Sequence, residues 1–330
     1  MRKLAILVAI IAAQAAAART VWIDTDVSIG SPIREVDDAY ALLLAFHSPE
    51  IRIAGISTTY GNASLGYTTR VARDIVKRFG GTASLNANQV FAGADSPRAR
   101  GRQSPASEAL AFALRKEKLT YVALGPLTNL ATLLQLHPEV ANRIERVVFL
   151  GGHGPGDRLA FGPNRSFHIH DANVFKDPAA VEMVLRSRIP LTLLPIETSS
   201  GLQVDANDLK ELSRSGLAGE YLARRSKVWL WFWTKFVGTK GGPIFDALGV
   251  LSVTRPELLT LESKYARMDE AGNLIVLPRQ MNGAQPVQCS TGFAPASKSF
   301  VMRRLVTRRS ANNKEAPFPN RPRRLQTAAP

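Results

Sequence analysis

Two pairs of aspartates lie close together in the segment IDTDVSIGSPIREVDDAYALLLAF, residues 23 to 46. Asp24 and Asp26 end an apolar run that predicts a strand, and Asp37 and Asp38 begin a run with helical apolar spacing. Carboxylates packed together raise one another's pKa unless a cation neutralises them. Oxygen ligands of this kind suit Ca²⁺ or Mg²⁺. Taken alone, the segment fits equally well a solvated turn in which Asp37 and Asp38 cap a helix.

The elements that must position these aspartates alternate between strand and helix. Strands are predicted at residues 20–24, 51–62, 119–125, 146–152 and 190–197, and helices at 36–46, 64–81, 126–136 and 177–187. This alternation predicts an α/β fold with a single open, mainly parallel, Rossmann-like sheet that has helices on both faces. After Thr198 the pattern becomes mainly helical, so we expect a helical C-terminal part. Both aspartate pairs then fall at the carboxyl edge of the sheet, where such folds bind ligands.

The two ends of the chain differ in composition from its body. Arg2 and Lys3, a short apolar run and an alanine-rich segment predict a cleaved signal peptide in residues 1–18, and hence a secreted or periplasmic protein. The apolar run is too short for a membrane span, so we expect no stable membrane insertion. Residues 301–330 are rich in Arg, Pro and Asn, which predicts a basic, disordered tail. Residues 19–300 are expected to form one domain.

Charge and cysteine content restrict the partners of this domain. The formal net charge of +15 at first suggests an anionic partner. Residues 301–330 carry eight Arg or Lys residues against Glu315, so the body is only moderately basic and no specific nucleic-acid partner is expected. Cys289 is the only cysteine, which excludes an internal disulfide, so core packing, with or without a metal, must stabilise the domain.

A phosphatase site is one interpretation of the acidic segment. The run DTDVS resembles the DxDx[TV] signature of the haloacid-dehalogenase-like phosphatases, in which the first aspartate, here Asp24, is phosphorylated. That family also needs a downstream lysine and a distant acidic pair. Here the second pair, Asp37 and Asp38, follows closely.

The segment also resembles the D-x-D-P-G-x-D-D-A-x-A-L signature of the nucleoside hydrolases of the inosine-uridine preferring type. Further matching blocks follow in that family's order: GISTTYGNASL, VALGPLTNLATLLQLHPEV, RVVFLGGHG, DANVFKDPAAVEMV and PIFDALGVLSVTRPELL. The resemblance runs from about residue 20 to about residue 260. It implies the nucleoside hydrolase fold, Ca²⁺ as cofactor, a small-molecule nucleoside as substrate and a homo-oligomer, since relatives are commonly dimers or tetramers. The implied reaction is hydrolysis of the N-glycosidic bond to free base and ribose.

The resemblance also implies roles for individual positions. Asp26 matches the aspartate that binds calcium and acts as base on a calcium-bound water. Asp38, Asp246 and the main-chain carbonyl of Leu124 match the other calcium ligands, and Asp24 matches a supporting residue. The positions that match residues binding ribose, or lying beside it, are Asp37, Asn62, Asn164, Asp171 and Asn173. Asp171 stands where the family usually has the longer glutamate.

Two departures from the family pattern bear on catalysis. Ten residues separate Asp26 from Asp37, where the signature has only P-G-x, so an insertion must loop out for Asp38 to meet Asp26. Phe245 stands where many members have a histidine that protonates the leaving base. Trp229, Trp233 and Phe245 are candidates for stacking on that base, which slightly favours purine nucleosides. The helical spacing of the tryptophans equally fits core packing.

Two functions from different classes follow. The first is a secreted, Ca²⁺-dependent ribonucleoside hydrolase. The second is a nucleoside-binding protein with degenerate catalysis, which Phe245 favours. The dehalogenase-type phosphatase is a weaker third hypothesis.

Overall fold

The computed structural model describes residues 18–31, 34–156 and 159–306. The predicted signal peptide, except Ala18, and residues 307–330 of the predicted tail lie outside the described residues. The described part contains a central nine-stranded sheet. Its strands, in sheet order, are β12 (Leu274–Leu277), β11 (Leu259–Met268), β13 (Gln285–Phe293), β8 (Leu191–Leu194), β5 (Ile144–Leu150), β4 (Leu119–Ala123), β1 (Arg19–Thr25), β2 (Ile51–Thr58) and β3 (Val90–Ala92).

The sheet is mainly parallel, as the alternating pattern predicted. Each neighbouring pair is parallel except the two that involve β11, which is antiparallel to β12 and to β13. The segment that forms β11, β12 and β13 follows the predicted helices and was not predicted as strand. The C-terminal part is therefore helical up to Thr254 and then extends the sheet.

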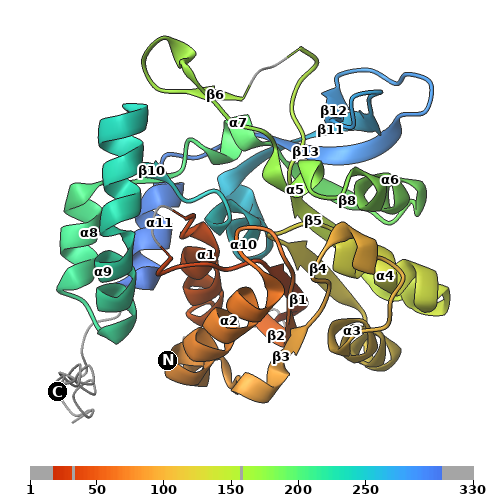
Figure 1. Ribbon diagram of the computed structural model, residues 1–330, viewed down its shortest axis with the longest axis horizontal. Coiled ribbons are helices and arrows are strands. Elements are labelled where there is room, and N and C mark those ends of the chain that lie inside the picture. Colours follow the sequence, from red (N-terminus) through yellow and green to blue (C-terminus); the bar gives the residue numbers. More distant parts are fainter. Residues whose placement is uncertain (1–17, 32–33, 157–158, 307–330) are drawn as a thin grey trace, which may run out of the picture.

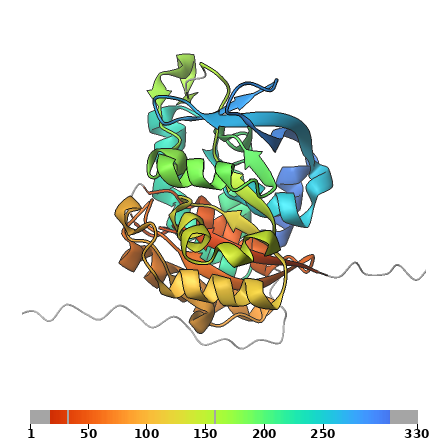
Figure 2. The same ribbon diagram turned by 90° about the vertical axis from the view of Figure 1, so that its right-hand side faces the viewer.

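Helices cover both faces of the sheet (Figures 1 and 2). One face carries α1 (Asp37–Phe46), α2 (Leu65–Phe79), α8 (Ala206–Ser213), α9 (Leu217–Trp231), α10 (Ala247–Thr254) and α11 (Ala296–Leu305), and the other carries α3 (Pro105–Lys116), α4 (Thr128–Leu136) and α6 (Pro178–Arg186). Successive strand residues point to opposite faces. Ile23 and Val122 therefore belong to the first apolar core, and Trp22 and Tyr121 belong to the second.

The C-terminal helix α11 corrects the predicted boundary of the tail. Val301 and Leu305 are fully buried against the first core, so the folded body continues beyond residue 300. No helix in the described part of the chain is long and apolar enough to cross a membrane.

The strand order reverses between β4 and β1. From β1 the chain moves outward through β2 and β3, and it then returns to β4 on the other side of β1. Ligands in open α/β sheets bind just beyond the carboxyl ends of the strands at such a reversal. Thr25 ends β1 and Leu124 follows β4, so the segments that begin with Asp26 and Leu124 meet at this position.

Candidate active site

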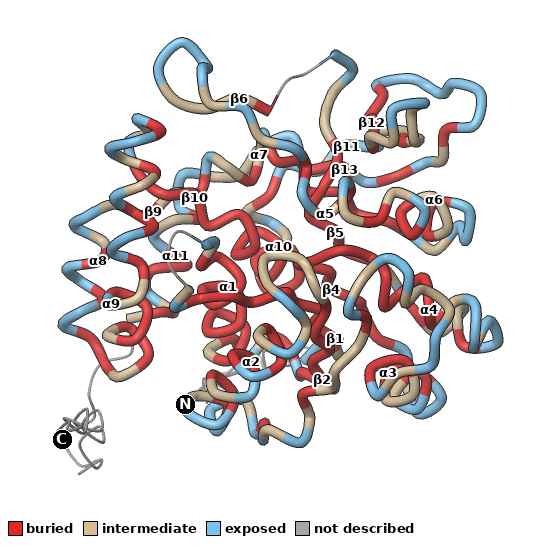
Figure 3. Tube along the Cα trace, in the orientation of Figure 1, coloured by how far each residue is buried: buried red, intermediate tan, exposed pale blue. Residues whose placement is uncertain are grey.

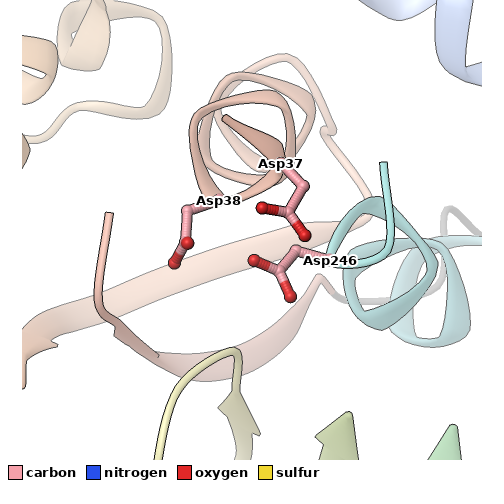
Figure 4. Close-up of side chains that lie close together, drawn as sticks. All are labelled: Asp37, Asp38 and Asp246. Carbon is pink, nitrogen blue, oxygen red and sulfur yellow. The ribbon is translucent and has the colours of Figure 1, made fainter. Parts of the chain in front are cut away.

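Three carboxylates meet beyond the end of β1 (Figure 4). Asp37 and Asp38 form the start of α1, and Asp246 immediately precedes α10. One carboxylate oxygen from each lies within 4.8 Å of the others, and all three residues are buried. The amino ends of two helices favour negative charge here, because their free N–H groups carry partial positive charge. Oδ1 of Asp37 is buried and has no hydrogen-bond partner among the described residues. A buried set of oxygen ligands with an unpartnered atom fits a hard divalent cation.

The inserted segment 27–36 does not separate the two aspartate pairs. The backbone N–H of Asp26 donates to Oδ1 of Asp38 at 3.2 Å, and the Thr25 hydroxyl donates to the same oxygen. Asn62 ties the pair together: its N–H donates to Asp26 Oδ2 at 2.7 Å, and its amide donates to Asp26 Oδ1 at 3.2 Å and to Asp38 Oδ2 at 3.3 Å. The structure therefore brings Asp38 to Asp26, while the compact group of three contains Asp37 rather than Asp26.

Two glycines let the backbone pack directly on Asp26. A Cβ atom at Gly61 would lie 1.7 Å from Oδ2 of Asp26, and one at Gly125 would lie 3.2 Å from its Cγ. A side chain at Gly61 would therefore displace the carboxylate. The loops after β2 and β4 fix Asp26 in one position.

Burial raises the pKa of each acidic group in the site. Burial, followed by the negative charge of Asp38, raises the pKa of Asp26 well above its ordinary value. Burial, followed by the charge of Asp37, raises the pKa of Asp38 to about 7. The pKa of Asp246 is raised well above its usual range by burial and then by Asp37. Without a cation, the folded chain therefore retains protons that the unfolded chain would release.

This proton retention predicts how the metal-free protein responds to pH. For Asp38, the contribution to stability is fully present below its ordinary pKa of 3.8 and is lost as the pH rises through about 7. With a chelator present, we therefore expect a lower Tm at about pH 8 than at about pH 6. Added Ca²⁺ should raise Tm more at the higher pH. Calorimetry measures both effects, and a metal-free Tm that stays level or rises across this interval would contradict the expectation.

Asp24 is held by hydrogen bonds from two neighbouring segments. Its Oδ1 accepts from Ser57 Oγ at 2.5 Å and from Asn129 Nδ2 at 2.8 Å, and the residue is fully buried. These hydrogen bonds give Asp24 a structural role, which argues against the phosphoryl-enzyme that the phosphatase hypothesis requires. Asn129 also donates to the carbonyl of Thr58 and accepts from the N–H of Ala94. It thereby holds the ends of β1 and β2 to the loop after β3.

We expect Asn129→Leu to lower the free energy of unfolding by about 3 kcal/mol, because it leaves several buried polar groups unpaired. Leucine has the same number of side-chain heavy atoms with the same branching, so the variant leaves no cavity and removes the hydrogen bonds. Urea unfolding measures it, and Asn207→Leu, at an exposed position on α8, is the matched control. Equal stability of the two variants would show that Asn129 does not hold the site together.

The other predicted ribose-binding residues lie in three different settings. Asp171 caps the short helix α5 (Ala172–Phe175), and its two oxygens accept from the N–H groups of Val174 and Gly152. Asn173 donates to the carbonyl of Leu124 at 3.0 Å and also to that of Leu150, so it lies beside the predicted calcium ligand.

Asn164 is separate from these residues. It is exposed, with a left-handed φ of 58°, in the turn of the hairpin formed by β6 (Ala160–Phe161) and β7 (Phe167–His168). Among the described residues it has no hydrogen bond to the site. The structure does not bring it to the carboxylates.

The aromatic candidates for base stacking lie mostly in the core. Trp229 and Trp233 are each only 2% exposed, and Phe245 is 8% exposed. The Phe245 ring packs edge-on against Trp233 and against Phe161 of the hairpin, with centroids 6.2 and 6.4 Å apart. Core packing therefore accounts for the helical stripe. The two tryptophans no longer favour a purine.

Glu35, in the insertion, has a contact that the sequence did not indicate. The indole N–H of Trp229 donates to its Oε2 at 2.7 Å. The neighbouring Arg34 donates to the carbonyl of Asn62. The insertion is thus attached to α9 at one side and to the loop that orients Asp26 at the other.

The fold and site define an α/β enzyme with an acidic centre where its sheet reverses. The model of the family described as inosine-uridine preferring nucleoside hydrolase matches residues 21–294, and the chain belongs to this family. Membership makes it an enzyme of the ribonucleoside hydrolase type and confirms the resemblance seen in the sequence.

Individual relatives agree with this assignment. The chain is 26% identical over 315 residues to uridine nucleosidase 1 of Arabidopsis thaliana, covering 85% of this chain and 88% of that protein. It is 28% identical over 269 residues to a pyrimidine-specific ribonucleoside hydrolase of Citrobacter koseri, covering 72% and 81%. Among solved structures, a plant nucleoside hydrolase superposes with a TM-score of 0.73 at 22% identity, covering 87% of this chain and 99% of that one. A purine-preferring ribonucleoside hydrolase from Gardnerella vaginalis gives 0.72 at 22% identity, covering 87% and 98%. These two structures support the fold.

Proposed function

We propose that the protein hydrolyses ribonucleosides to free base and ribose, with Asp26 as the base and Ca²⁺ as the cofactor. The observation that carries this proposal is the meeting of Asp26, Asp38 and Asn62 at the end of β1, despite the insertion. Family membership supplies the reaction class.

The proposed calcium ligands are Asp26, Asp38, Asp246 and the carbonyl of Leu124. Asp37 lies beside them with an oxygen that has no partner in the described part of the chain, which makes it the first candidate to contact either the cation or a ribose hydroxyl. The set consists entirely of oxygen atoms, which suits Ca²⁺. When bound, this cation supplies Lewis-acid activation of water and positions for the ribose hydroxyls.

Asp26 takes the proton from the attacking water. Asn62 donates to both of its oxygens, so the carboxylate has a fixed direction. In the metal-free chain, burial and then the charge of Asp38 raise the pKa of Asp26, which increases its affinity for a proton. Negative charge from Asp37 and Asp38 stabilises the positive charge that develops on the sugar as the bond to the base breaks.

We also propose that the protein is exported. Support comes from the signal-peptide pattern of residues 1–18 and from the start of β1 at Arg19, directly after the expected cleavage region. Amino-terminal sequencing of the protein secreted by its host tests this. A mature chain that begins near residue 19 is expected, and retention of Met1 would contradict export with cleavage.

The reaction is tested with a panel of ribonucleosides in the presence of Ca²⁺, with chromatography for the free base and a reducing-sugar assay for ribose. Uridine and inosine come first, because the family is described by these two and curated relatives are named for uridine. The 2′-deoxynucleosides serve as controls and should react poorly, since they lack a hydroxyl for the site. Binding of nucleosides without turnover would instead support the nucleoside-binding protein with degenerate catalysis.

A further inference from the structure

Residues 221–240, YLARRSKVWLWFWTKFVGTK, combine five Arg or Lys residues with six aromatic residues and contain no acidic residue. They form most of α9 and the π-helical turn after it, Phe232–Val237. The structure divides the aromatic residues between two sides. Trp229 and Trp233 face the core, whereas Trp231 is 58% exposed and Phe236 is 67% exposed.

The outward side of this segment is both apolar and basic. Val228 is 53% exposed, so three of the seven large apolar side chains exposed in the described residues lie within positions 228–236. Lys227 and Lys235 are also exposed, one helical turn before and after Trp231, and therefore on the same side. We call Lys227, Val228, Trp231, Lys235 and Phe236 the α9 face. Clusters of exposed apolar side chains on soluble proteins usually mark an interaction surface.

The surroundings of the α9 face are also mainly basic. The groove between α8 and α9, beside Trp231, is lined by Lys210, Arg224, Lys227 and Lys235, and Glu220 is the one acidic side chain among its described lining residues. Both helices lie on one flank of the molecule, at the left in Figure 1, and Figure 3 shows exposed positions along their outer side. The α9 face thus points away from the sheet.

We propose that the α9 face binds the surface of an anionic lipid bilayer. Lysines complement the negative surface of such a membrane. Tryptophan prefers the level of the lipid headgroups, and a helix with basic and aromatic side chains lies in that plane. Val228 has no ring on which a nucleobase could stack, so lipid fits the face better than single-stranded nucleic acid. The association is peripheral and independent of the proposed hydrolysis.

Intrinsic fluorescence and sedimentation test the proposal with the full chain. Trp22, Trp229 and Trp233 are at most 2% exposed, so Trp231 is the tryptophan whose surroundings change on binding. Vesicles of phosphatidylcholine with about one third phosphatidylserine should shift the emission to the blue and sediment the protein, and vesicles of phosphatidylcholine alone should do neither. Lys235→Glu should weaken binding by about fivefold or more, and Trp231→Ser by about tenfold.

Phe112→Ser is the matched control. Phe112 is also 58% exposed and has Lys116 over its ring, but it lies on α3, at the opposite face of the sheet. This variant should bind vesicles as the wild type does. Any binding by the basic ends of the chain is common to all variants, so the comparison isolates the α9 face. Because Trp231, Lys235 and Phe112 are all exposed, each of the three variants should fold and hydrolyse nucleosides like the wild type.

Four results would overturn the proposal. Vesicle binding that is unchanged in Trp231→Ser would place the contact elsewhere, and equal binding to neutral vesicles would remove the role of charge. A dimer that dissociates in Trp231→Ser, without vesicle binding, would make the α9 face a contact between two copies of the chain. Binding of oligothymidine without vesicle binding would make it a nucleic-acid surface.

Discussion

Replacing Asp26 with asparagine is expected to lower kcat for nucleoside hydrolysis by about 10³-fold, because the attacking water loses the group that accepts its proton. Asparagine keeps the size of the side chain and can still accept from the N–H of Asn62, so the fold should persist. Steady-state kinetics with uridine or inosine measure the loss. Asp95→Asn, at an exposed loop position, is the control and should retain full activity. A kcat within tenfold of the wild type would remove Asp26 from the role of base.

The second large effect is expected at Asp246. This residue comes from a distant part of the sequence and supplies one of the three clustered carboxylates. Its side chain makes no capping hydrogen bond to α10, so Asp246→Ala should leave that helix intact. We expect the variant to bind Ca²⁺ about 100-fold more weakly, since loss of a charged ligand lowers the affinity of oxygen-ligand sites strongly.

Titration calorimetry measures this affinity, and activity should return only at high Ca²⁺. A chelator should abolish wild-type activity, and added Ca²⁺ should restore it. If Asp246→Ala bound Ca²⁺ as tightly as the wild type, the cluster would not be the cation site.

The parallel half of the fold could be predicted from the sequence because its strands are short apolar runs. The four residues of β8 are all buried, and so are the five of β4. By contrast, only two of the ten residues of β11 are buried, Leu259 and Ala266. A strand near the edge of a sheet, with few buried positions, lacks the apolar pattern that identifies strands. For that reason β11 was missed, whereas β12 is a fully buried apolar run that was missed although it carries the pattern.

The acidic centre could be predicted in part, because a motif fixes which residues occur but not their contacts. Asp38 was expected to lie beside Asp26, and in the structure the backbone N–H of Asp26 donates to Oδ1 of Asp38 at 3.2 Å. The role of Asn129 depends on contacts with three separate segments, which no local pattern contains. Asn164 was matched to a ribose-binding position of the family, and it lies in an exposed turn away from the carboxylates.

The aromatic helix shows a further limit of sequence patterns. Trp229, Trp231 and Trp233 alternate along the chain, yet the middle one is exposed while the others are buried. In a helix, Trp229 and Trp233 lie on one face and Trp231 on the opposite one, so the spacing separates them but does not say which face packs against the body. Only the packing of α9 against the body decides which ring is free.

The dependence of nucleoside hydrolysis on free Ca²⁺, measured in parallel for the wild type and Asp26→Asn, tests the proposed function most directly. In the wild type, we expect base and ribose to appear in equal amounts, with a rate that rises to saturation with Ca²⁺ and falls to background with chelator. In Asp26→Asn, Ca²⁺ should still raise Tm while hydrolysis stays near background. Full-rate hydrolysis by the wild type in excess chelator would contradict the assignment of a Ca²⁺ and aspartate centre.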